Sequence, residues 1–94
     1  MNDWATVIKM LETGEVRAAN KIDGMWMANT EVKQAILAAF KAGTLVEYTH
    51  ENYSGFVDKH NIPPRSFTPE DKIRLVPGGS SVRAGSFVAS GVII

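Results

Sequence analysis

The chain has 94 residues with ten basic and ten acidic side chains, so its formal net charge is zero, and it contains no cysteine. A neutral chain lacks the excess of positive charge that binds a nucleic-acid backbone or an anionic membrane surface. Without cysteine, disulfides, thiolate zinc sites and cysteine nucleophiles are excluded. Because the N-terminus has no apolar signal core and every apolar stretch is too short to span a bilayer, we expect a cytoplasmic protein without nucleic-acid or membrane partners.

The first predicted element is a helix that starts near Trp4 and ends at Gly14. Asn2 or Asp3 can cap it, because a short polar side chain accepts hydrogen bonds from the free N–H groups of the first turn. Glycine suits the C-terminal end because it readily adopts the left-handed conformation. Apolar residues at helical spacing predict one buried stripe, formed by Trp4, Val7, Ile8 and Leu11.

A hairpin is predicted next, with strands at residues 16–22 and 25–27 joined by Asp23-Gly24. Both turn residues tolerate the positive φ that a two-residue hairpin turn requires. The alternative is a loop that leads directly into the following helix. The cluster Met25-Trp26-Met27 is expected to pack in the core, although such a cluster also suits an adaptable binding surface.

A second helix is predicted from Asn29 or Thr30 to Gly43, with Glu31 placed favourably for the helix dipole. Alanines on this helix favour helical structure and leave room for close packing. The expected buried stripe consists of Val32, Ile36, Leu37 and Phe40.

Shorter elements are predicted in the middle of the chain. Residues 44–49 alternate weakly and favour a strand, whereas residues 50–66 are expected to form a loop with a short strand at 53–57. Pro69 suits the start of a single helical turn. Residues 1–72 are therefore predicted to form an N-terminal α+β domain.

From Val76 onward the sequence repeats with a period of six residues. One phase of the repeat is aliphatic, at Val76, Val82, Val88 and Ile94. A second phase carries glycine, at Gly79, Gly85 and Gly91. This period fits neither a helix nor a simple strand and is typical of a parallel β-helix, in which short strands form the faces of a triangular prism. Aliphatic residues would point inward from each face, and glycine would help the backbone turn between faces.

Residues 73–94 are therefore predicted to begin a β-helix, with residues 76–93 as its first full coil. A single coil leaves its apolar stack open and its strand edges unpaired, so we expect the sequence to be truncated relative to a longer parent. The alternative is an accidental spacing in a glycine-rich segment that forms an ordinary sheet.

Four stretches of the chain carry a resemblance to a known family. They are residues 14–26, residues 32–40, Phe56-Val57-Asp58-Lys59, and residues 73–77 together with 82–89. In this order and spacing they resemble the tetrahydrodipicolinate N-succinyltransferases, which belong to the hexapeptide-repeat acyltransferases. The family often has tryptophan where this chain has Glu31, and residues 44–52 match no segment of the family pattern.

The resemblance implies an α+β region followed by the first coil of a left-handed parallel β-helix, in a homotrimer. It also implies transfer of a succinyl group from the co-substrate succinyl-CoA to the amine of the ring-opened dicarboxylate substrate, in lysine and diaminopimelate biosynthesis. The family's arginine before its Val-Pro step contributes to substrate binding, and the matching residue here is Arg74. A guanidinium can bind a carboxylate through two parallel hydrogen bonds.

The family's acid/base carboxylate and most of its CoA contacts belong to later coils. The resemblance therefore implies no catalytic residue within this chain, which alone should be inactive or nearly so.

Other readings of the candidate residues stay open. The alternative to a substrate contact is that Arg74 is a solvent-facing strand residue. Arg83, at the second position of its hexad, is expected to face outward. His50 and His60 are expected on surface loops, and no metal site is predicted because they lack helix-face spacing and a cysteine partner. Asp58 shows no pairing partner in the sequence.

Two other functions are compatible with the sequence. One is a small stand-alone α+β binding or assembly module without catalytic activity. The other is a related hexapeptide acyltransferase that uses acetyl-CoA, although the resemblance of residues 21–26 favours the succinyl branch.

Overall fold

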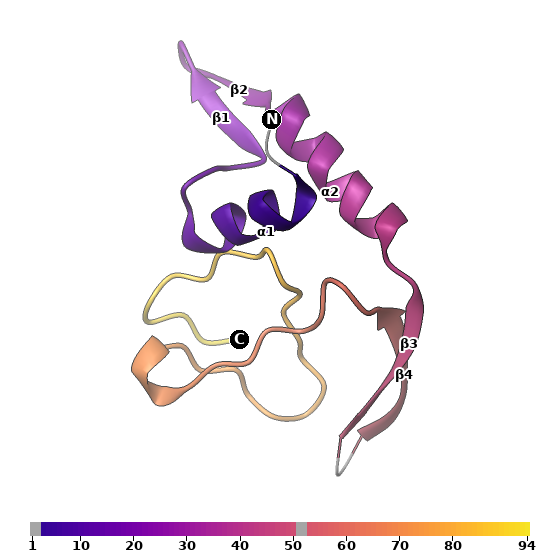
Figure 1. Cartoon of the computed structure of the whole chain (residues 1–94). Helices are drawn as coiled ribbons and strands as arrows, with labels where there is room; N and C mark the ends of the chain where they lie inside the picture. The colour runs from indigo at the N-terminus through magenta and orange to yellow at the C-terminus, as the bar shows by residue number, and fades with distance from the viewer. Residues whose placement is uncertain (1–2, 51–52) are drawn as a thin grey trace.

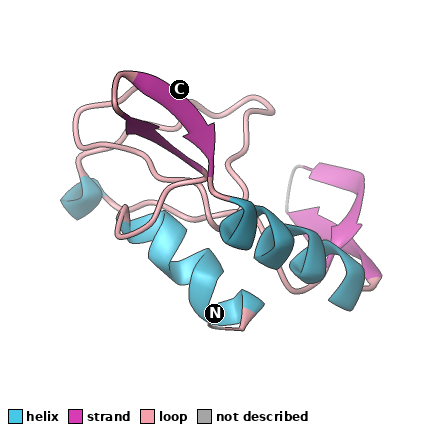
Figure 2. Ribbon diagram, turned by 90° about the horizontal axis from the view of Figure 1, so that it is seen from above, coloured by secondary structure: helices cyan, strands magenta, loops and turns pink. Residues whose placement is uncertain are grey.

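The computed structural model describes residues 3–50 and 53–94, which form two α-helices, two antiparallel hairpins and a long C-terminal segment (Figure 1). The helices pack against each other, and one hairpin extends from each end of α2. Figure 2 shows the same arrangement from above, with the loops of the C-terminal half beside α1. The predicted α+β class is confirmed for the described residues.

Helix α1 spans Trp4–Thr13 and has the predicted caps at both ends. The side chain of Asp3 accepts a hydrogen bond from the N–H of Thr6 at 2.9 Å, whereas Asn2 lies outside the described residues. Gly14 ends the helix with φ of 85°, and its N–H donates to the carbonyl of Leu11. The N-terminal and C-terminal caps that the sequence predicts for this helix are therefore both present.

Helix α2 spans Thr30–Ala42 and begins at the predicted cap, Asn29. Its buried residues are Val32, Ala35 and Ala39, and Ile36 and Phe40 are partly buried, so three of the four predicted stripe residues do face inward. Leu37, which was expected in the core, is 57% exposed, so that prediction is wrong. Small alanines allow α1 to approach α2 closely, and this approach selects the alanine face instead of the leucine face.

The hydrophobic core is small and lies between the two helices. Val7 of α1 and Val32 of α2 are fully buried at its centre, and partly buried apolar residues surround them. The surrounding residues are Trp4, Leu11, Val16 and Ile36. Ile62, which follows β4, is also buried.

The predicted first hairpin is confirmed, with β1 at Ala19–Ile22 and β2 at Met25–Ala28. Asp23 and Gly24 form its turn with φ of 51° and 80°. The expectation that the Met-Trp-Met cluster packs in the core is wrong, because all three of its side chains are exposed.

The two strands expected in the middle of the chain pair with each other as a second hairpin. Strand β3 spans Leu45–His50, and strand β4 spans Tyr53–Lys59. The hydroxyl of Tyr48 donates to the carbonyl of Lys59 at 2.7 Å and fixes the open end of this hairpin. The predicted single helical turn is present as the short 3₁₀ helix η1, at Pro69–Asp71.

The C-terminal segment (residues 73–94) turns three times and returns beside its own start. Glycines 79, 85 and 91, one at each turn, have positive φ, between 92° and 122°. The N–H groups of Arg74 and Val76 donate to the carbonyls of Val92 and Ile94, so the two ends lie parallel. This return is compatible with one circuit of a prism, but the left-handed β-helix itself stays a prediction.

Burial along the repeat is uneven. Val82 and Val88 are partly buried, whereas Val76 and Ile94 are 47% and 38% exposed. One side of the C-terminal segment is held by residues 63–65, where Arg65 donates its N–H to Val82 and Ala84 donates its N–H to Pro63.

Candidate functional site

Arg74, the predicted substrate-binding residue, has a fixed backbone and a free side chain. Its N–H donates to the carbonyl of Val92 at 3.0 Å, and its carbonyl accepts from the N–H of Ile94 at 2.8 Å. The side chain is exposed, and its guanidinium has no hydrogen-bond or ion-pair partner among residues 3–50 and 53–94. Such a group can bind a carboxylate without first breaking another contact.

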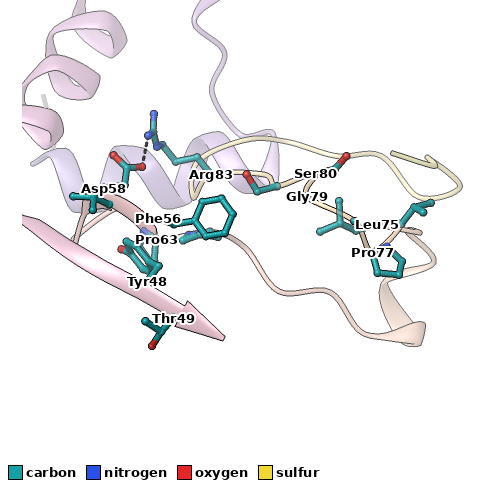
Figure 3. A pocket seen from close by; sticks show the side chains of 15 residues that line it. Tyr48, Thr49, Phe56, Asp58, Pro63, Leu75, Pro77, Gly79, Ser80 and Arg83 are labelled. Carbon is teal, nitrogen blue, oxygen red and sulfur yellow. Dashed lines mark hydrogen bonds and ion pairs between the residues drawn. The ribbon is translucent and has the colours of Figure 1, made fainter. Parts of the chain in front are cut away.

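A groove of about 790 Å³ lies between the β3–β4 hairpin and the first turn of the C-terminal segment (Figure 3). The hairpin contributes Tyr48 and Phe56 to one wall, and Leu75 and Pro77 lie on the opposite wall. The backbone of residues 78–81 completes the groove. Nothing in the sequence indicated this groove, because its walls belong to segments that are distant along the chain.

Arg74 does not line this groove, although its neighbour Leu75 does. Successive side chains of an extended segment point to opposite sides. The structure therefore separates the predicted substrate contact from this groove.

Arg83 does line the groove, and it is exposed, as its position in the hexad predicts. Its guanidinium forms an ion pair with the carboxylate of Asp58 on β4 and lies over the ring of Phe40, 4.9 Å from the ring centroid. The expectation that Asp58 is unpaired is therefore wrong. The pair joins α2, β4 and the C-terminal segment at one point.

The hydrogen bond from Arg83 holds the pKa of Asp58 below its ordinary value of 3.8, with a smaller contribution from the N–H of Lys59. Asp58 consequently stays ionised and neutralises Arg83 at neutral pH. Because its charge is already compensated, Arg83 is less suited than Arg74 to bind an incoming carboxylate.

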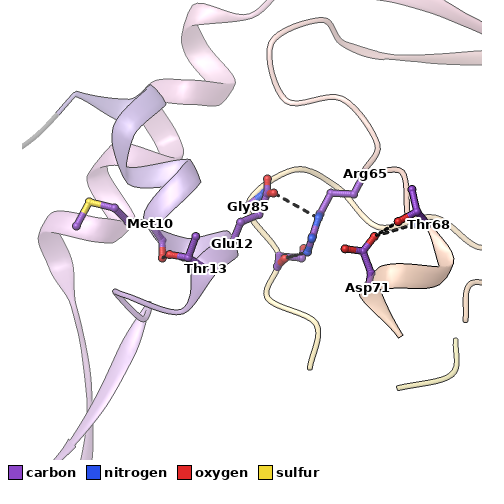
Figure 4. A network of polar contacts seen from close by, with 8 residues as sticks. Met10, Glu12, Thr13, Arg65, Thr68, Asp71 and Gly85 are labelled. Atoms are coloured by element: carbon purple, nitrogen blue, oxygen red, sulfur yellow. Dashed lines mark hydrogen bonds and ion pairs between the residues drawn. The ribbon is translucent and has the colours of Figure 1, made fainter. Parts of the chain in front are cut away.

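A second polar network fixes the C-terminal segment to α1 (Figure 4). Glu12 accepts a hydrogen bond from the N–H of Gly85 at 2.9 Å and forms an ion pair with Arg65 at 3.4 Å. Arg65 also donates to the carbonyl of Ser86 at 2.6 Å and lies over the ring of Phe67. This network and the Asp58–Arg83 pair hold opposite sides of the same turn.

The histidines do not form a site. His60 is exposed, and its Nδ1 accepts a hydrogen bond from the N–H of Thr44 at 3.1 Å. The side chain of His50 lies outside the described residues. Within the described part of the chain, no three metal-ligating side chains cluster, and no helix is long and apolar enough to cross a membrane.

The sequence predicted a substrate contact at Arg74, which stays a prediction, and gave no indication of the Asp58–Arg83 and Glu12–Arg65 pairs. The partners lie in different elements and stand in neither helical nor strand spacing, so no local rule joins them. The stretch that contains Asp58 was noticed only through its family resemblance.

Comparison with known proteins identifies what this arrangement is similar to. Residues 3–42 match the family model described as "Tetrahydrodipicolinate N-succinyltransferase N-terminal". These residues cover α1, the first hairpin and α2.

Curated relatives extend the similarity over nearly the whole chain. The 2,3,4,5-tetrahydropyridine-2,6-dicarboxylate N-succinyltransferase of Nitrosococcus oceani is 34% identical over 92 residues, which cover 93% of this chain and 33% of the relative. The enzymes of the same name from Nitrosomonas europaea and Shewanella amazonensis are 34% and 35% identical, over 96% and 98% of this chain and 34% of each relative. The chain thus spans about a third of the length of these relatives.

Proposed function

We propose that this chain is the N-terminal part of a tetrahydrodipicolinate N-succinyltransferase, because residues 3–42 match the family model of the N-terminal region of that enzyme. The enzyme transfers the succinyl group of succinyl-CoA to the amine of ring-opened tetrahydrodipicolinate, in the cytoplasmic synthesis of lysine and diaminopimelate. The amine nitrogen forms an amide bond with the succinyl carbonyl carbon, the carbon–sulfur bond breaks, and CoA leaves as its thiol. The observation that carries the proposal is similarity to curated N-succinyltransferases over 93% of the chain or more.

The C-terminal segment is proposed to be the first coil of a left-handed parallel β-helix, through which the enzyme forms a homotrimer. Three features support the coil. Its turns follow the six-residue glycine repeat, the turns at Arg83–Ser86 and Ala89–Val92 are closed by hydrogen bonds of 3.2 Å, and the chain returns parallel to its start. Glycine at the third position of such a turn supplies the positive φ that the turn requires.

Arg74 is proposed to bind one carboxylate of the substrate. Its backbone is held by the parallel return of the chain, so its position depends on the coil, and its guanidinium has no partner in the part of the chain that the structure describes. The acid/base group is proposed to lie outside this chain, in later coils. The 94 residues by themselves are accordingly expected to show no transferase activity.

The test is steady-state kinetics on the enzyme that carries this chain, with Arg74 changed to alanine. Loss of a charged hydrogen-bonded contact corresponds to roughly 1.5–3 kcal/mol, so the KM for the amine substrate should rise by about 10- to 100-fold. The KM for succinyl-CoA should be unchanged, because this thioester is bound elsewhere. Arg74→Lys should recover only part of the loss, since an ammonium cannot make the two parallel contacts.

Arg17→Ala is the matched control, because Arg17 is also an exposed arginine but lies before the first hairpin. It should leave both KM values unchanged. An unaltered KM for the amine substrate in Arg74→Ala would exclude the proposed contact, and absence of succinyl transfer by the unmodified enzyme would exclude the function.

A further inference from the structure

The segment that leads to Arg74 begins with a residue in an uncommon backbone conformation. Of the non-glycine residues that the structure describes, Lys72 and Asp23 have positive φ, and that of Lys72 is 57°. The left-handed region is unfavourable for a residue with a Cβ atom, because this atom then lies close to the following carbonyl oxygen. Such conformations persist where the surrounding structure enforces them, and they cluster at functional sites. Lys72 stands two residues before the proposed substrate contact.

The conformation of Lys72 is enforced by Asp71 and the short helix η1 (Figure 4). The Oδ2 of Asp71 accepts a hydrogen bond from the N–H of Thr68 at 2.8 Å, and the N–H of Asp71 donates to the carbonyl of Thr68 at 3.0 Å. The N–H of Lys72 donates to the carbonyl of Pro69 at 3.1 Å. Its carbonyl accepts from the N–H of Gly91 at 2.7 Å. Lys72 is therefore held by η1 on one side and by the coil on the other.

The direction of the Arg74 side chain depends on this turn, because Arg74 lies on an edge strand. Its N–H and carbonyl pair with residues 92 and 94, whereas those of Ile73 and Leu75 face the other edge, where the described residues provide no hydrogen-bond partner. Arg74 is exposed, and Ile73 and Leu75 are partly buried. A shift of the strand by one residue would turn the guanidinium to the buried side.

We propose that Asp71 is a positioning residue for substrate binding. By closing η1 and holding Lys72 in the left-handed conformation, it fixes the register in which Arg74 points outward, toward a substrate carboxylate. This inference rests on the proposed function, because Arg74 is the group that contacts the substrate. Asp71 acts through geometry and not through charge, since its carboxylate binds the N–H and hydroxyl of Thr68 and forms no ion pair within the ranges that the structure describes.

The experiment is steady-state kinetics on the enzyme that carries this chain, with Asp71 changed to alanine or asparagine. Asp71→Ala removes the acceptor for Thr68, so the KM for the amine substrate should rise by about three- to tenfold, while the KM for succinyl-CoA stays unchanged. Asp71→Asn keeps an oxygen that accepts this hydrogen bond and should restore most of the loss. When Arg74 is already alanine, Asp71→Ala should cause no further increase, because the contact that it positions is absent.

Glu70→Ala is the matched control. Glu70 is an exposed carboxylate of the same turn, and its side chain makes no hydrogen bond or ion pair with any residue that the structure describes. The variant should leave both KM values unchanged. Lys72→Val and Lys72→Gly provide a second test, because they remove the same charge but differ in their tolerance of positive φ. Lys72→Val should raise the KM for the amine substrate more than Lys72→Gly does.

The outcomes separate this inference from the proposed function. If Arg74→Ala raises the KM for the amine substrate and Asp71→Ala does not, the positioning role is overturned and the proposed function stands. The role is also overturned if Glu70→Ala has the same effect, since charge is then the cause. A rise of both KM values in Asp71→Ala would overturn it as well, because the fold as a whole is then disturbed. If Arg74→Ala has no effect, the proposed substrate contact fails, and the positioning role fails with it.

Discussion

Gly43→Ala is predicted to disturb the junction between α2 and the second hairpin. A Cβ atom added to Gly43 would lie 2.1 Å from Oδ1 and 2.9 Å from Cγ of Asn61. The backbone of Gly43 has φ of −82°, which any residue adopts, so the effect is steric and not conformational. The side chain of Asn61 would have to move.

The magnitude follows from what Asn61 does in the fold. Its Nδ2 donates to the carbonyl of Ala39 at 2.8 Å, and Ala39 is fully buried. Loss of this hydrogen bond costs about 1 kcal/mol, and displacement of a packed side chain costs about 1–3 kcal/mol. We therefore expect Gly43→Ala to lower the free energy of unfolding by about 2–4 kcal/mol.

Urea unfolding followed by circular dichroism measures this change. The decisive comparison is a double-mutant cycle with Asn61→Ala, which removes the obstructing amide. In that background Gly43→Ala should have little effect, or stabilise slightly, because alanine restricts the unfolded chain. Equal destabilisation in both backgrounds would refute the steric explanation.

Three further changes test contacts elsewhere. Because the pKa of Asp58 is lowered in the fold, its pairing with Arg83 stabilises above the ordinary pKa of 3.8 and is lost as the pH falls through the folded pKa. Asp58→Asn should therefore reduce the urea midpoint at about pH 7 but not at about pH 2. Asp3→Ala removes the cap on the N–H of Thr6, so the Tm followed by far-ultraviolet circular dichroism should fall. Gly85→Ala forces a non-glycine residue to φ of 98° and should cost about 1–3 kcal/mol in urea unfolding, whereas an unchanged midpoint would contradict the turn conformation.

The elements that sequence reasoning located correctly are those with local causes. Asp3 and Gly14 bound the first helix, and Asp23-Gly24 form the hairpin turn, because a cap or a tight turn depends on a few adjacent residues. Arg74 was singled out through its place in a family pattern, and its substrate contact stays a prediction. Its role still depends on the proposed function.

Packing faces and long-range pairs could not be obtained in this way. On α2, Leu37 was wrongly placed in the core and Ala35 was missed, because hydrophobicity ranks Leu37 above Ala35, whereas close approach of α1 requires the smaller residue. Likewise, hydrophobicity placed Trp26 in the core, although the hairpin extends away from it.

By itself, the sequence determined where helices and turns begin and end, the six-residue repeat and its turn glycines, and the similarity of residues 3–42 to a family model. Only the tertiary structure decided that Arg83 is neutralised by Asp58, while the guanidinium of Arg74 has no partner among the described residues. The physical reason is that caps and turns are settled by neighbours along the chain. The availability of a charge depends on which distant groups the fold brings within hydrogen-bonding distance.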